Sequence, residues 1–525
     1  MRSYKRGSTQ HVLGTAKKFK YVLVVEGLAT GAAAGLIAVL YRILLEHAES
    51  FVMAAASFIK GNYLYIAGWF IVLLILGFLV MKISQWEPYI SGSGIPQAEG
   101  EVISFIDQKW YRVLPAKAVS GVLCAIGGLS LGREGPSIQL GAMAGKGLAK
   151  TFHRAKVEEH LLLTCGAAAG LSAAFNAPLA GVMFALEEVH KNFNVNVLIS
   201  VMCASVTGTF ISQNIFGLAP AFHFVVEETM PLHNYGYLLV LGILAGVLGV
   251  VYNKCTIKMQ DTLARSKFIK PGYSILLAFL LAGIFALCLP QVLGGGHRMI
   301  EMLTNNDAML IKTMGMLLVM KFIFSLISFG SGAPGGIFFP LLVLGSFIGA
   351  IFAVIAIRYF GVSSMYMPNF IIVAMAGMFA AIVRAPITGI ILIAEMCGTL
   401  THLLPLAVVS IAAYLTATML NCDPIYESLL HRLLLKNGVS TGEEKGEKLL
   451  VQNVVELGSH ICEKKICEVN WPRHCLIVSI ERGGKEIIPN GETIIHCGDI
   501  LVALLNEGDS AYVKHAFAKC CGVKE

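Results

Sequence analysis

The chain has 525 residues, of which 56% are hydrophobic and 14% are charged, and its formal net charge is +7. Soluble domains carry about 25% charged residues, so this composition excludes an ordinary soluble protein and predicts a multi-pass membrane protein with a smaller polar part. No aromatic and basic module accompanies the positive charge, and nucleic acid is therefore not expected as a partner.

The first 20 residues are basic and precede a long apolar stretch. Their cations are Arg2, Lys5, Arg6, Lys17, Lys18 and Lys20, and they contain no acid. The stretch that follows is too long for the core of a cleavable signal peptide. By the positive-inside rule, we expect residues 1–20 to be a cytosolic segment and the N-terminus to be cytoplasmic. A cytoplasmic C-terminus and a place in the cytoplasmic membrane of a prokaryote are further expectations, which do not follow from this rule.

Apolar segments recur along most of the chain, and several have about the ~20 residues that span a bilayer. They cover residues 21–45, 64–83, 112–130, 160–187, 195–217, 235–253, 273–294, 309–329, 335–359, 367–396 and 403–420. Glycine and proline interrupt several of them, so the number of full crossings stays open. The expected fold is an all-α polytopic membrane domain with broken helices over residues 21–435.

Two parts of this membrane region resemble each other. Residues 169–174 (AGLSAA) return about 200 residues later as residues 376–381 (AGMFAA), and each copy is followed by an Ala-Pro pair and an acid, Glu187 or Glu395. A second set of matches joins Pro136, Gly141 and Gly145 to Pro340, Gly345 and Gly349.

We interpret these matches as a duplication, with repeats at about 21–217 and 235–420. Chance similarity of glycine- and alanine-rich helices is the alternative interpretation. Duplicated halves whose helices break at matching positions point to a transport site at the interface of the repeats.

The most informative break surrounds Glu134, in residues 132–136 (GREGP). A carboxylate at membrane depth is costly and marks a functional site by default, and a broken helix is tolerated there only where it lines a cavity or packs on protein. The repeat aligns this break with residues 336–340 (GIFFP), so that two helix starts could form an anion site. A third break, residues 91–96 (SGSGIP), places Ser93 between glycines. Small-residue packing motifs and a plain turn are the alternatives.

These three breaks together resemble a known family. Residues 92–96 (GSGIP), 132–136 (GREGP) and 336–340 (GIFFP) occur in the order of the three signature motifs of the CLC family of chloride channels and chloride/proton antiporters. The resemblance covers roughly residues 20–430. It implies inverted repeats, a homodimer whose subunits each hold an anion pathway, and chloride, protons and membrane lipid as partners.

The resemblance also implies roles for matched residues. Ser93 and Tyr426 would donate their hydroxyl groups to chloride, and Ile337 and Phe338 would donate backbone N–H groups. Glu134 would be the external gating glutamate. Deprotonated, it would occupy an anion site and block it; protonated, it would lose its charge and swing away. Protons and chloride would thus compete for the same donors.

Coupled exchange needs a second proton site that faces the cytosol. The resemblance assigns the internal proton glutamate to Glu188 and proton and water access to Glu187, whereas a solvated helix end is the interpretation without it. Channels of the family commonly lack a glutamate at the position of Glu188. Its presence therefore favours a secondary active chloride/proton antiporter, with a passive voltage- or pH-gated chloride channel as the alternative.

Two cations accompany these acids. Lys117 matches a basic position of the family and would favour anions through its long-range field, with snorkelling near a helix end as the alternative. Arg133 is expected to bind local carbonyl groups or an acid such as Glu99, and its role would be in pathway electrostatics. Phe339 departs from the smaller residue that is common in relatives and would narrow the pore. Fluoride-selective relatives depart at the serine and the tyrosine, which this chain keeps, so chloride is expected, with nitrate and bromide as passengers.

The polar part begins with residues 436–447, which read as a linker. Residues 448–525 resemble a TrkA-C domain, a small α+β module, with strands expected at 476–480 and 500–504 and a final helix at 509–517. The resemblance implies a regulatory domain that binds a small molecule or nucleotide, or that dimerises. A purely structural dimer clamp is the alternative.

The chain has 13 cysteines and no C-x-x-C spacing. We therefore expect reduced thiols rather than disulfides, and neither a metal nor a cofactor. An intramembrane enzyme that uses Glu134 and Glu188 as acid and base is another alternative. It would need a nucleophile or metal ligands near these acids, and no H-E-x-x-H motif is present, so the protein is not expected to be an enzyme. A tail-regulated membrane sensor that transports nothing is a third alternative, but it would not need three broken helices.

Overall fold

The computed structural model describes residues 9–191, 193, 195–222, 224, 228–265, 272–305, 310–437, 448–456, 458–472, 475–483, 485–506, 517 and 519–522. The chain divides into two compact units, Met1–Lys436 and Asn437–Glu525. Most of the expected linker and of the expected final helix lies outside the described residues, as do the side chains of the basic segment 1–20.

The membrane unit is helical throughout. The helices of its first half are α1 (Thr9–Phe58), α2 (Tyr63–Trp86), α3 (Ile95–Val102), α4 (Trp110–Ile126), α5 (Glu134–Thr151), α6 (Lys156–Phe175), α7 (Pro178–Phe184) and α8 (Val195–Phe216). Those of its second half are α9 (Tyr235–Arg265), α10 (Ser274–Cys288), α11 (His297–Asn305), α12 (Ile311–Gly330), α13 (Phe338–Phe360), α14 (Met367–Val383), α15 (Pro386–Met396), α16 (Leu403–Met419) and α17 (Ile425–Lys436).

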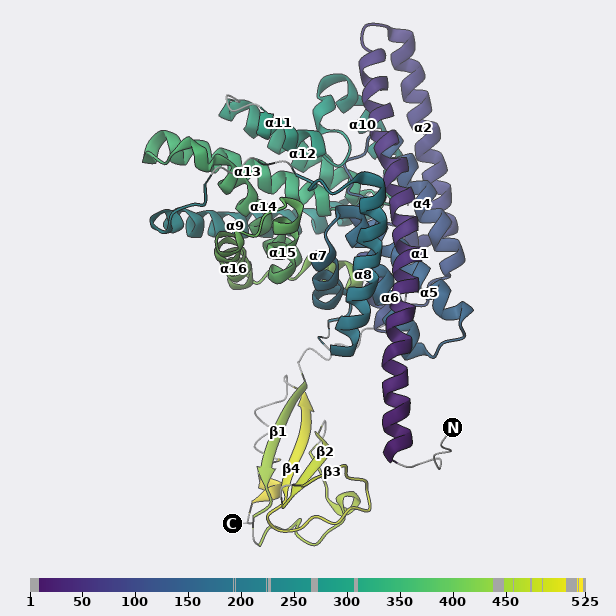
Figure 1. Cartoon of the computed structure of the whole chain (residues 1–525), viewed down its shortest axis with the longest axis vertical. Helices are drawn as coiled ribbons and strands as arrows, with labels where there is room; N and C mark the ends of the chain where they lie inside the picture. The colour runs from purple at the N-terminus through teal and green to yellow at the C-terminus, as the bar shows by residue number, and fades with distance from the viewer. Residues whose placement is uncertain are drawn as a thin grey trace. The chain divides into compact units, whose positions relative to one another are not determined.

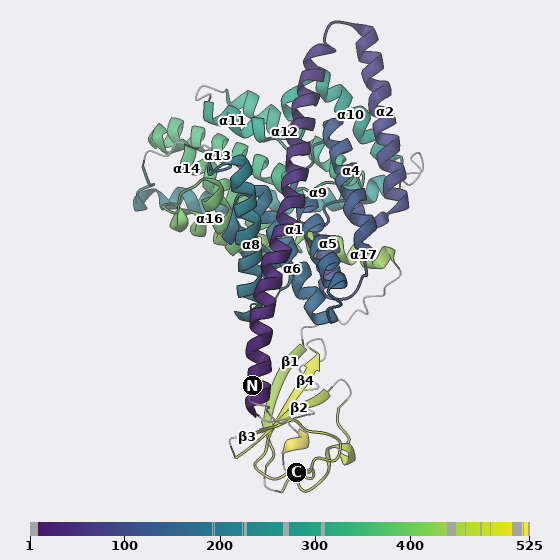
Figure 2. The same cartoon turned by 45° about the vertical axis from the view of Figure 1, so that its right-hand side comes forward.

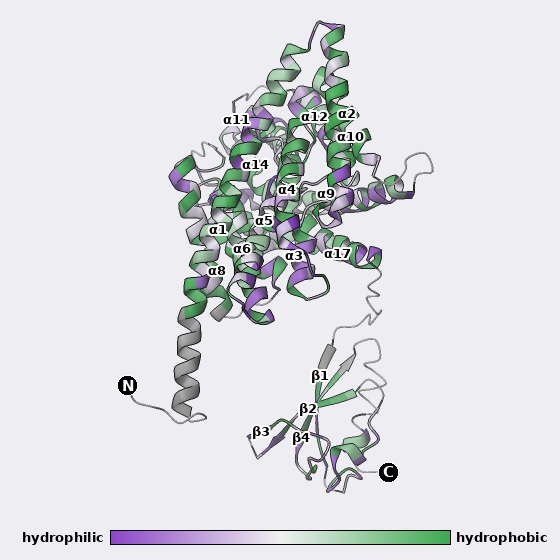
Figure 3. Ribbon diagram, turned by 90° about the vertical axis from the view of Figure 1, so that its right-hand side faces the viewer, coloured by the Kyte–Doolittle hydropathy of each residue, from purple (hydrophilic) through white to green (hydrophobic). Residues whose placement is uncertain are grey.

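The two halves repeat the same order of elements, α2 to α8 matching α10 to α16. In the first half α1 packs along α6 and α8, and in the second half α9 packs against α14 and α16 (Figure 1). Both views place α14 and α16 on the side opposite α2 and α4 (Figure 2). Among the described residues, seven helices are long and apolar enough to cross a membrane. Figure 3 shows mostly hydrophobic residues along α1, α2 and α8, whereas those of α3 are largely hydrophilic.

The halves are joined by reciprocal contacts between matching residues. The carboxylate of Glu395, near the end of α15, accepts the backbone N–H groups of Leu179 and Ala180 at 3.0 and 2.8 Å, at the start of α7. The carboxylate of Glu187 does the same at the start of α15, where the N–H of Thr388 donates at 2.8 Å. Each acid therefore caps the broken helix of the other half, where free N–H groups favour a negative charge.

Glycines permit the closest helix packing in the membrane unit. A Cβ atom added to Gly141 of α5 would overlap the carbonyl of Gly166 in α6, and one added to Gly166 would overlap the carbonyl of Gly141. Small residues at such a crossing let two backbones approach, which stabilises helix pairs in a membrane through van der Waals contact. This contact fixes α5, and with it the position of Glu134 at its first residue.

The second unit is built on one antiparallel sheet. Its described strands are β1 (Lys448–Val454), β2 (Cys475–Arg482), β3 (Lys485–Ile487) and β4 (Ile500–Asn506), in the order β1-β4-β2-β3. The strands expected at 476–480 and 500–504 lie within β2 and β4. The apolar side chains of Ile480 and Leu501 face a small core that includes Val455, Ile461 and Phe517.

The cysteines of this unit include a disulfide between Cys462 and Cys497, which corrects the expectation of reduced thiols alone. Their Cα atoms lie 5.5 Å apart because an isolated bridge pairs Lys465 with Ile494 and draws two distant loops together. The two cysteines are 35 residues apart in the sequence, a spacing that carries no local signal for this pairing.

The close crossing of α5 and α6 gives a first testable prediction. In Gly141→Ala the new methyl group meets backbone that cannot move aside cheaply, so we expect a cost of about 1–3 kcal/mol and a lower thermal unfolding temperature in detergent. Gly315→Ala in α12 is the matched control, because nothing lies within 4 Å of a Cβ added there. Equal unfolding temperatures for the two variants would contradict the packing role.

A second prediction concerns the ion pair of the tail. Arg482 Nε and Nη2 donate to Asp499 at 2.8 and 2.7 Å, and the N–H of His496 donates to the same carboxylate at 2.8 Å. Burial alone would raise the pKa of Asp499, but these donors outweigh it and hold that pKa below its usual value. The pair thus stabilises the tail above the unfolded-state pKa of about 3.9, and this contribution is lost as the pH falls through the lower folded-state pKa.

We expect Asp499→Ala to destabilise the tail by about 2 kcal/mol, measured by hydrogen exchange of β2 and β4 in the intact protein at neutral pH. The exposed pair of Lys465 and Glu492 supplies the control, since Glu492→Ala should cost no more than about 0.5 kcal/mol. In the wild type, pepsin should cleave the tail faster below pH 4, and the variant should lack this acid step. A pH-independent wild type would count against the assignment.

Candidate functional site

Three helix starts meet at the centre of the membrane unit. Gly132, before α5, and Gly336, before α13, form an isolated antiparallel bridge in which each N–H donates to the other's carbonyl, at 2.6 and 2.8 Å. Gly335 donates its N–H to Gly92 at 3.0 Å, which joins the loop before α3 to the same point. A Cβ atom at Gly135 would overlap the hydroxyl of Ser93. The three breaks predicted from the sequence are therefore one site.

Ser93 is placed by the glycines around it. Gly92 and Gly94 have φ values of 69° and 99°, in the left-handed region that favours glycine, and the turn between them presents the serine. Ser93 is 2% exposed and its hydroxyl makes no hydrogen bond with the described residues. A buried hydroxyl without a partner is costly, so an acceptor placed here would be bound favourably.

Lys117 holds this turn in place. Its Nζ donates to the carbonyl groups of Ile90 and Gly92 at 2.7 Å each, and the side chain is fully buried. The snorkelling alternative is therefore wrong, because the ammonium group points into the protein. Lys321 makes the matching contact in the second half, where it donates to Gly294 at 2.7 Å. The lysine charge faces carbonyl oxygens and not an open anion site.

Two further donors approach from the second half. Tyr426, in the first turn of α17, is fully buried and its hydroxyl makes no hydrogen bond with the described residues. Ile337 caps α13 and Phe338 begins it, so their N–H groups are among those that a helix cannot satisfy itself. The ring of Phe338 packs against Phe175, Phe184 and Phe379. Aromatic packing thus fixes the backbone whose amides were predicted to bind an anion.

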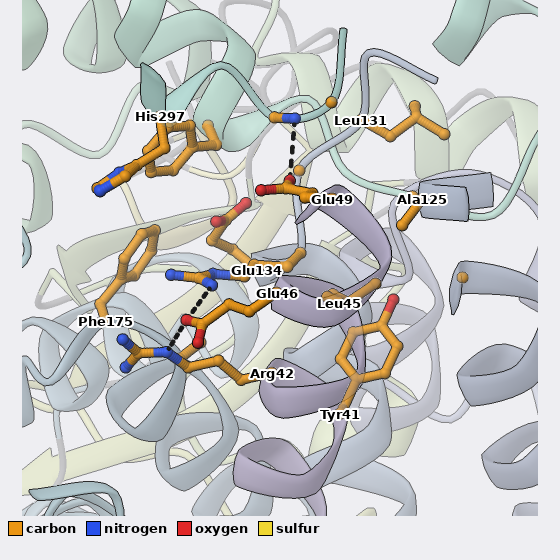
Figure 4. A pocket seen from close by; sticks show the side chains of 18 of the residues that line it. Tyr41, Arg42, Leu45, Glu46, Glu49, Ala125, Leu131, Glu134, Phe175 and His297 are labelled. Carbon is orange, nitrogen blue, oxygen red and sulfur yellow. Dashed lines mark hydrogen bonds and ion pairs between the residues drawn. The ribbon is translucent and has the colours of Figure 1, made fainter. Parts of the chain in front are cut away.

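Glu134 is the first residue of α5 and lies at a cavity of about 380 Å³ (Figure 4). It is fully buried, and its carboxylate interacts with the backbone N–H of Phe339 at the start of α13. A carboxylate in this position can lose its contact with the protein at little cost once it is protonated.

The wall of this cavity carries charges that the sequence analysis missed. Glu46 accepts hydrogen bonds from Arg42 at 2.8 Å and from Arg133 at 3.0 Å, and Glu49 accepts the N–H of Gly295 at 3.3 Å (Figure 4). Residues 42, 46 and 49 recur at helical spacing in an otherwise apolar segment, and that pattern is the signal that could have found them.

Arg133 therefore pairs with Glu46, which corrects the expectation of Glu99 as its acid. Glu99 binds Lys191 instead, with Nζ and Oε1 2.6 Å apart. Arg133 reaches Glu46 because it precedes α5 on the side of the cavity, where α1 passes and carries Glu46. Phe339 also lines the cavity and packs against Phe222 and His297. That it narrows a pore stays a prediction.

Glu187 and Glu188 are adjacent in sequence but face different surroundings. They lie in a π-helical turn, Ala185–Val189, in which the N–H of His190 donates to Ala185 at 2.8 Å. Glu188 is 5% exposed and its Oε1 has no partner among the described residues. The carboxylate of Glu187 caps α15 instead. Turns of this kind are frequent at functional sites, and here the extra residue separates the two acids.

Other polar clusters do not form a site. The carboxylates of Glu101, Asp107 and Glu159 lie within 4.8 Å of one another, but Lys146 Nζ lies 2.5 and 2.6 Å from the first two, so an ammonium group already neutralises them. Residues 128–132 (GLSLG) have the spacing of a hydrolase nucleophile elbow. Ser130 in that segment is fully buried, and its hydroxyl has no partner among the described residues.

The structure thus brings most of the predicted residues together. Those at the meeting point of the helix starts are Ser93, Glu134, Ile337, Phe338 and Tyr426. Glu188 lies close enough to Tyr426 to interact with it electrostatically. The other predicted residues do not point at this meeting point. Lys117 binds carbonyl groups, Arg133 binds Glu46, and Glu187 binds the start of α15.

Comparison with known proteins shows which family has this sequence and fold. Residues 72–418 match the profile of the voltage gated chloride channel family, and residues 450–518 match that of the TrkA-C domain. The H(+)/Cl(−) exchange transporter ClcA of Vibrio campbellii is 37% identical over 400 residues, which are 74% of this chain and 83% of that protein. ClcA of Yersinia pestis is 31% identical over 467 residues, 86% and 96% of the two chains.

Solved structures agree. A slow cyanobacterial Cl⁻/H⁺ antiporter matches with a TM-score of 0.75 and 30% identity over 79% of this chain and 99% of its own. A CLC-type fluoride/proton antiporter shares the fold at 22% identity and a TM-score of 0.65, over 77% and 97%. The predicted fold class, a helical membrane domain with a small strand-containing C-terminal domain, is confirmed. The chain belongs to the voltage gated chloride channel family.

Proposed function

We propose that the protein is a secondary active transporter that exchanges chloride for protons across the cytoplasmic membrane. One observation carries the proposal: the buried hydroxyl groups of Ser93 and Tyr426 and the buried carboxylate of Glu134 interact with one another where α3, α5 and α13 begin. Relatives named H(+)/Cl(−) exchange transporters support it.

Chloride is bound by donors of moderate strength. Ser93 and Tyr426 donate hydroxyl groups, and Ile337 and Phe338 donate backbone N–H groups at the positive end of α13. Transport requires binding that is strong enough for entry and weak enough for release. Because carbonyl groups hold Lys117 and Glu46 holds Arg133, neither cation traps the ion, and both act on it through their field.

Glu134 couples the two ions. As a carboxylate it takes the place of chloride at the same helix starts, and as a neutral acid it releases them. The external cavity brings water to this group, so its proton is exchanged with one side of the membrane. Glu188 receives a proton from the cytosol. Glu187, which caps α15, borders the region through which water and protons reach Glu188.

The remaining assignments complete the proposal. The membrane domain covers residues 21–435, a linker 436–447, and a cytosolic TrkA-C-like domain 448–525, with both termini cytoplasmic. Two chains form a homodimer in which each holds its own pathway. The tail is a regulatory domain that responds to a small molecule or nucleotide.

The test of Glu134 is the simultaneous measurement of chloride and proton flux in proteoliposomes. In Glu134→Ala the tethered anion is gone, so chloride flux should persist while the proton flux driven by a chloride gradient falls to background. Glu492→Gln, at an exposed acid of the tail, is a control that should keep both fluxes. Proton coupling that survives in Glu134→Ala would refute the role of this residue.

The test of Glu188 separates an antiporter from a passive channel. Glu188→Gln keeps the size of the side chain but cannot carry a proton, so chloride flux should continue and proton flux should be lost. Glu158→Gln removes an acid at the start of α6 and should leave the proton-to-chloride ratio unchanged. If wild-type chloride flux moves no protons at any pH, the protein is a passive chloride channel and the exchanger proposal fails.

A further inference from the structure

An ion pair lies beside Glu188 at the cytosolic end of the pathway. Lys191 Nζ is 2.6 Å from Glu99 Oε1, the lysine side chain is 41% exposed, and the glutamate side chain is 3% exposed. The second oxygen of Glu99 has no partner among the described residues. A lysine that reaches from solvent to a buried carboxylate does more than an exposed surface pair, because its loss would leave that acid unpaired.

The backbone conformation at Lys191 directs its side chain to Glu99. The π-helical turn Ala185–Val189 ends at His190, and Lys191 then adopts a left-handed conformation with φ of 52°. This conformation is uncommon for a residue with a long side chain and costs free energy, so other contacts must hold it. The contact with Glu99 does so and brings the ammonium group back toward α3.

The surroundings of Glu188 are rich in acids. Glu99 faces it from α3, Glu427 and Tyr426 from α17, and Glu187 from its own turn. Lys191 is the cation that faces Glu188 in the described part of this cluster. On α6, His160 lies close enough to His190 to interact with it electrostatically.

The pair also joins the two ion sites. Glu99 lies in the eight-residue helix α3, which begins directly after the turn that presents Ser93. Lys191 follows directly on the π-helical turn that carries Glu188. A single ion pair therefore ties the element that binds the proton to the element that binds chloride.

We propose that Lys191, held by Glu99, is a positioning residue that sets the pH at which Glu188 exchanges protons with the cytosol. The inference rests on the proposed role of Glu188. The ammonium group stabilises the ionised form of both nearby acids, and Glu99 opposes it by favouring the protonated form of Glu188. Removal of the cation and removal of the acid must therefore shift the cytosolic pH dependence in opposite directions.

The experiment uses inside-out membrane vesicles, in which the bath sets the cytosolic pH while the luminal pH is fixed, and records chloride-driven proton flux. For Lys191→Met we expect the half-maximal point to move by about one pH unit to higher pH, and for Glu99→Gln by a similar amount to lower pH. The double variant should return close to the wild type, and Lys191→Arg should restore the profile.

Lys150 and Glu159 form the matched control. Their Nζ and Oε2 lie 2.8 Å apart, with side chains 48% and 1% exposed, and Lys156 also binds Glu159 at 3.1 Å. The double variant Lys150→Met/Lys156→Met therefore removes the cations from a buried acid that does not act on Glu188, and Lys150→Met alone is the milder control. We expect the pH profile of both control variants to stay unchanged. Shifts of the same sign in Lys191→Met and Glu99→Gln, no shift in either, or an equal shift in a control variant would overturn the inference.

The two proposals fail separately. If Glu188→Gln keeps its proton flux, the role of Glu188 is wrong and the inference falls with it. If Glu188→Gln abolishes proton flux while Lys191→Met and Glu99→Gln keep the wild-type profile, the exchanger proposal stands and only the role of Lys191 is refuted. Because Lys191→Arg and Glu99→Gln preserve size, they keep the test valid should Lys191→Met fail to fold.

Discussion

The structure depends on the pair of backbone hydrogen bonds between Gly132 and Gly336. Residues about 200 positions apart bond to each other reciprocally, and this contact joins the two halves of the membrane unit. It holds the starts of α5 and α13 next to each other. A bulky residue on either strand would separate the helix starts, and the donors would then no longer converge on one ion.

Buried charge in this protein is used mainly to hold backbone. Lys117 and Lys321 each neutralise carbonyl groups of a glycine turn, and Glu187 and Glu395 each satisfy the start of a broken helix. An interior with few charges can keep broken helices only if every free N–H and carbonyl group finds such a partner. Ser93, Glu134 and Tyr426 are among the buried polar groups that keep no such partner in the described part of the chain.

Short motifs allowed the fold, the three helix starts and the side chains of Ser93 and Glu134 to be predicted, because a glycine or proline acts on its own neighbours. Partners that come from distant segments could not be read in this way. Arg133 was assigned the wrong acid because α1 lies far away in the sequence, and the pairing of Cys462 with Cys497 depends on a bridge between two loops. Lys117 was left between two roles for the same reason: its acceptors are carbonyl groups, which no sequence pattern marks.

Glu395 caps the start of α7 and Glu187 caps the start of α15, so each half of the membrane unit depends on an acid of the other half. Each half ends its broken helix with the carboxylate that the other half needs, so neither half is a complete folding unit. A single ancestral copy would have had to borrow the missing acid from a second copy of itself. The two halves, produced today as separate chains, would each present an uncapped helix and would be stable only once reunited.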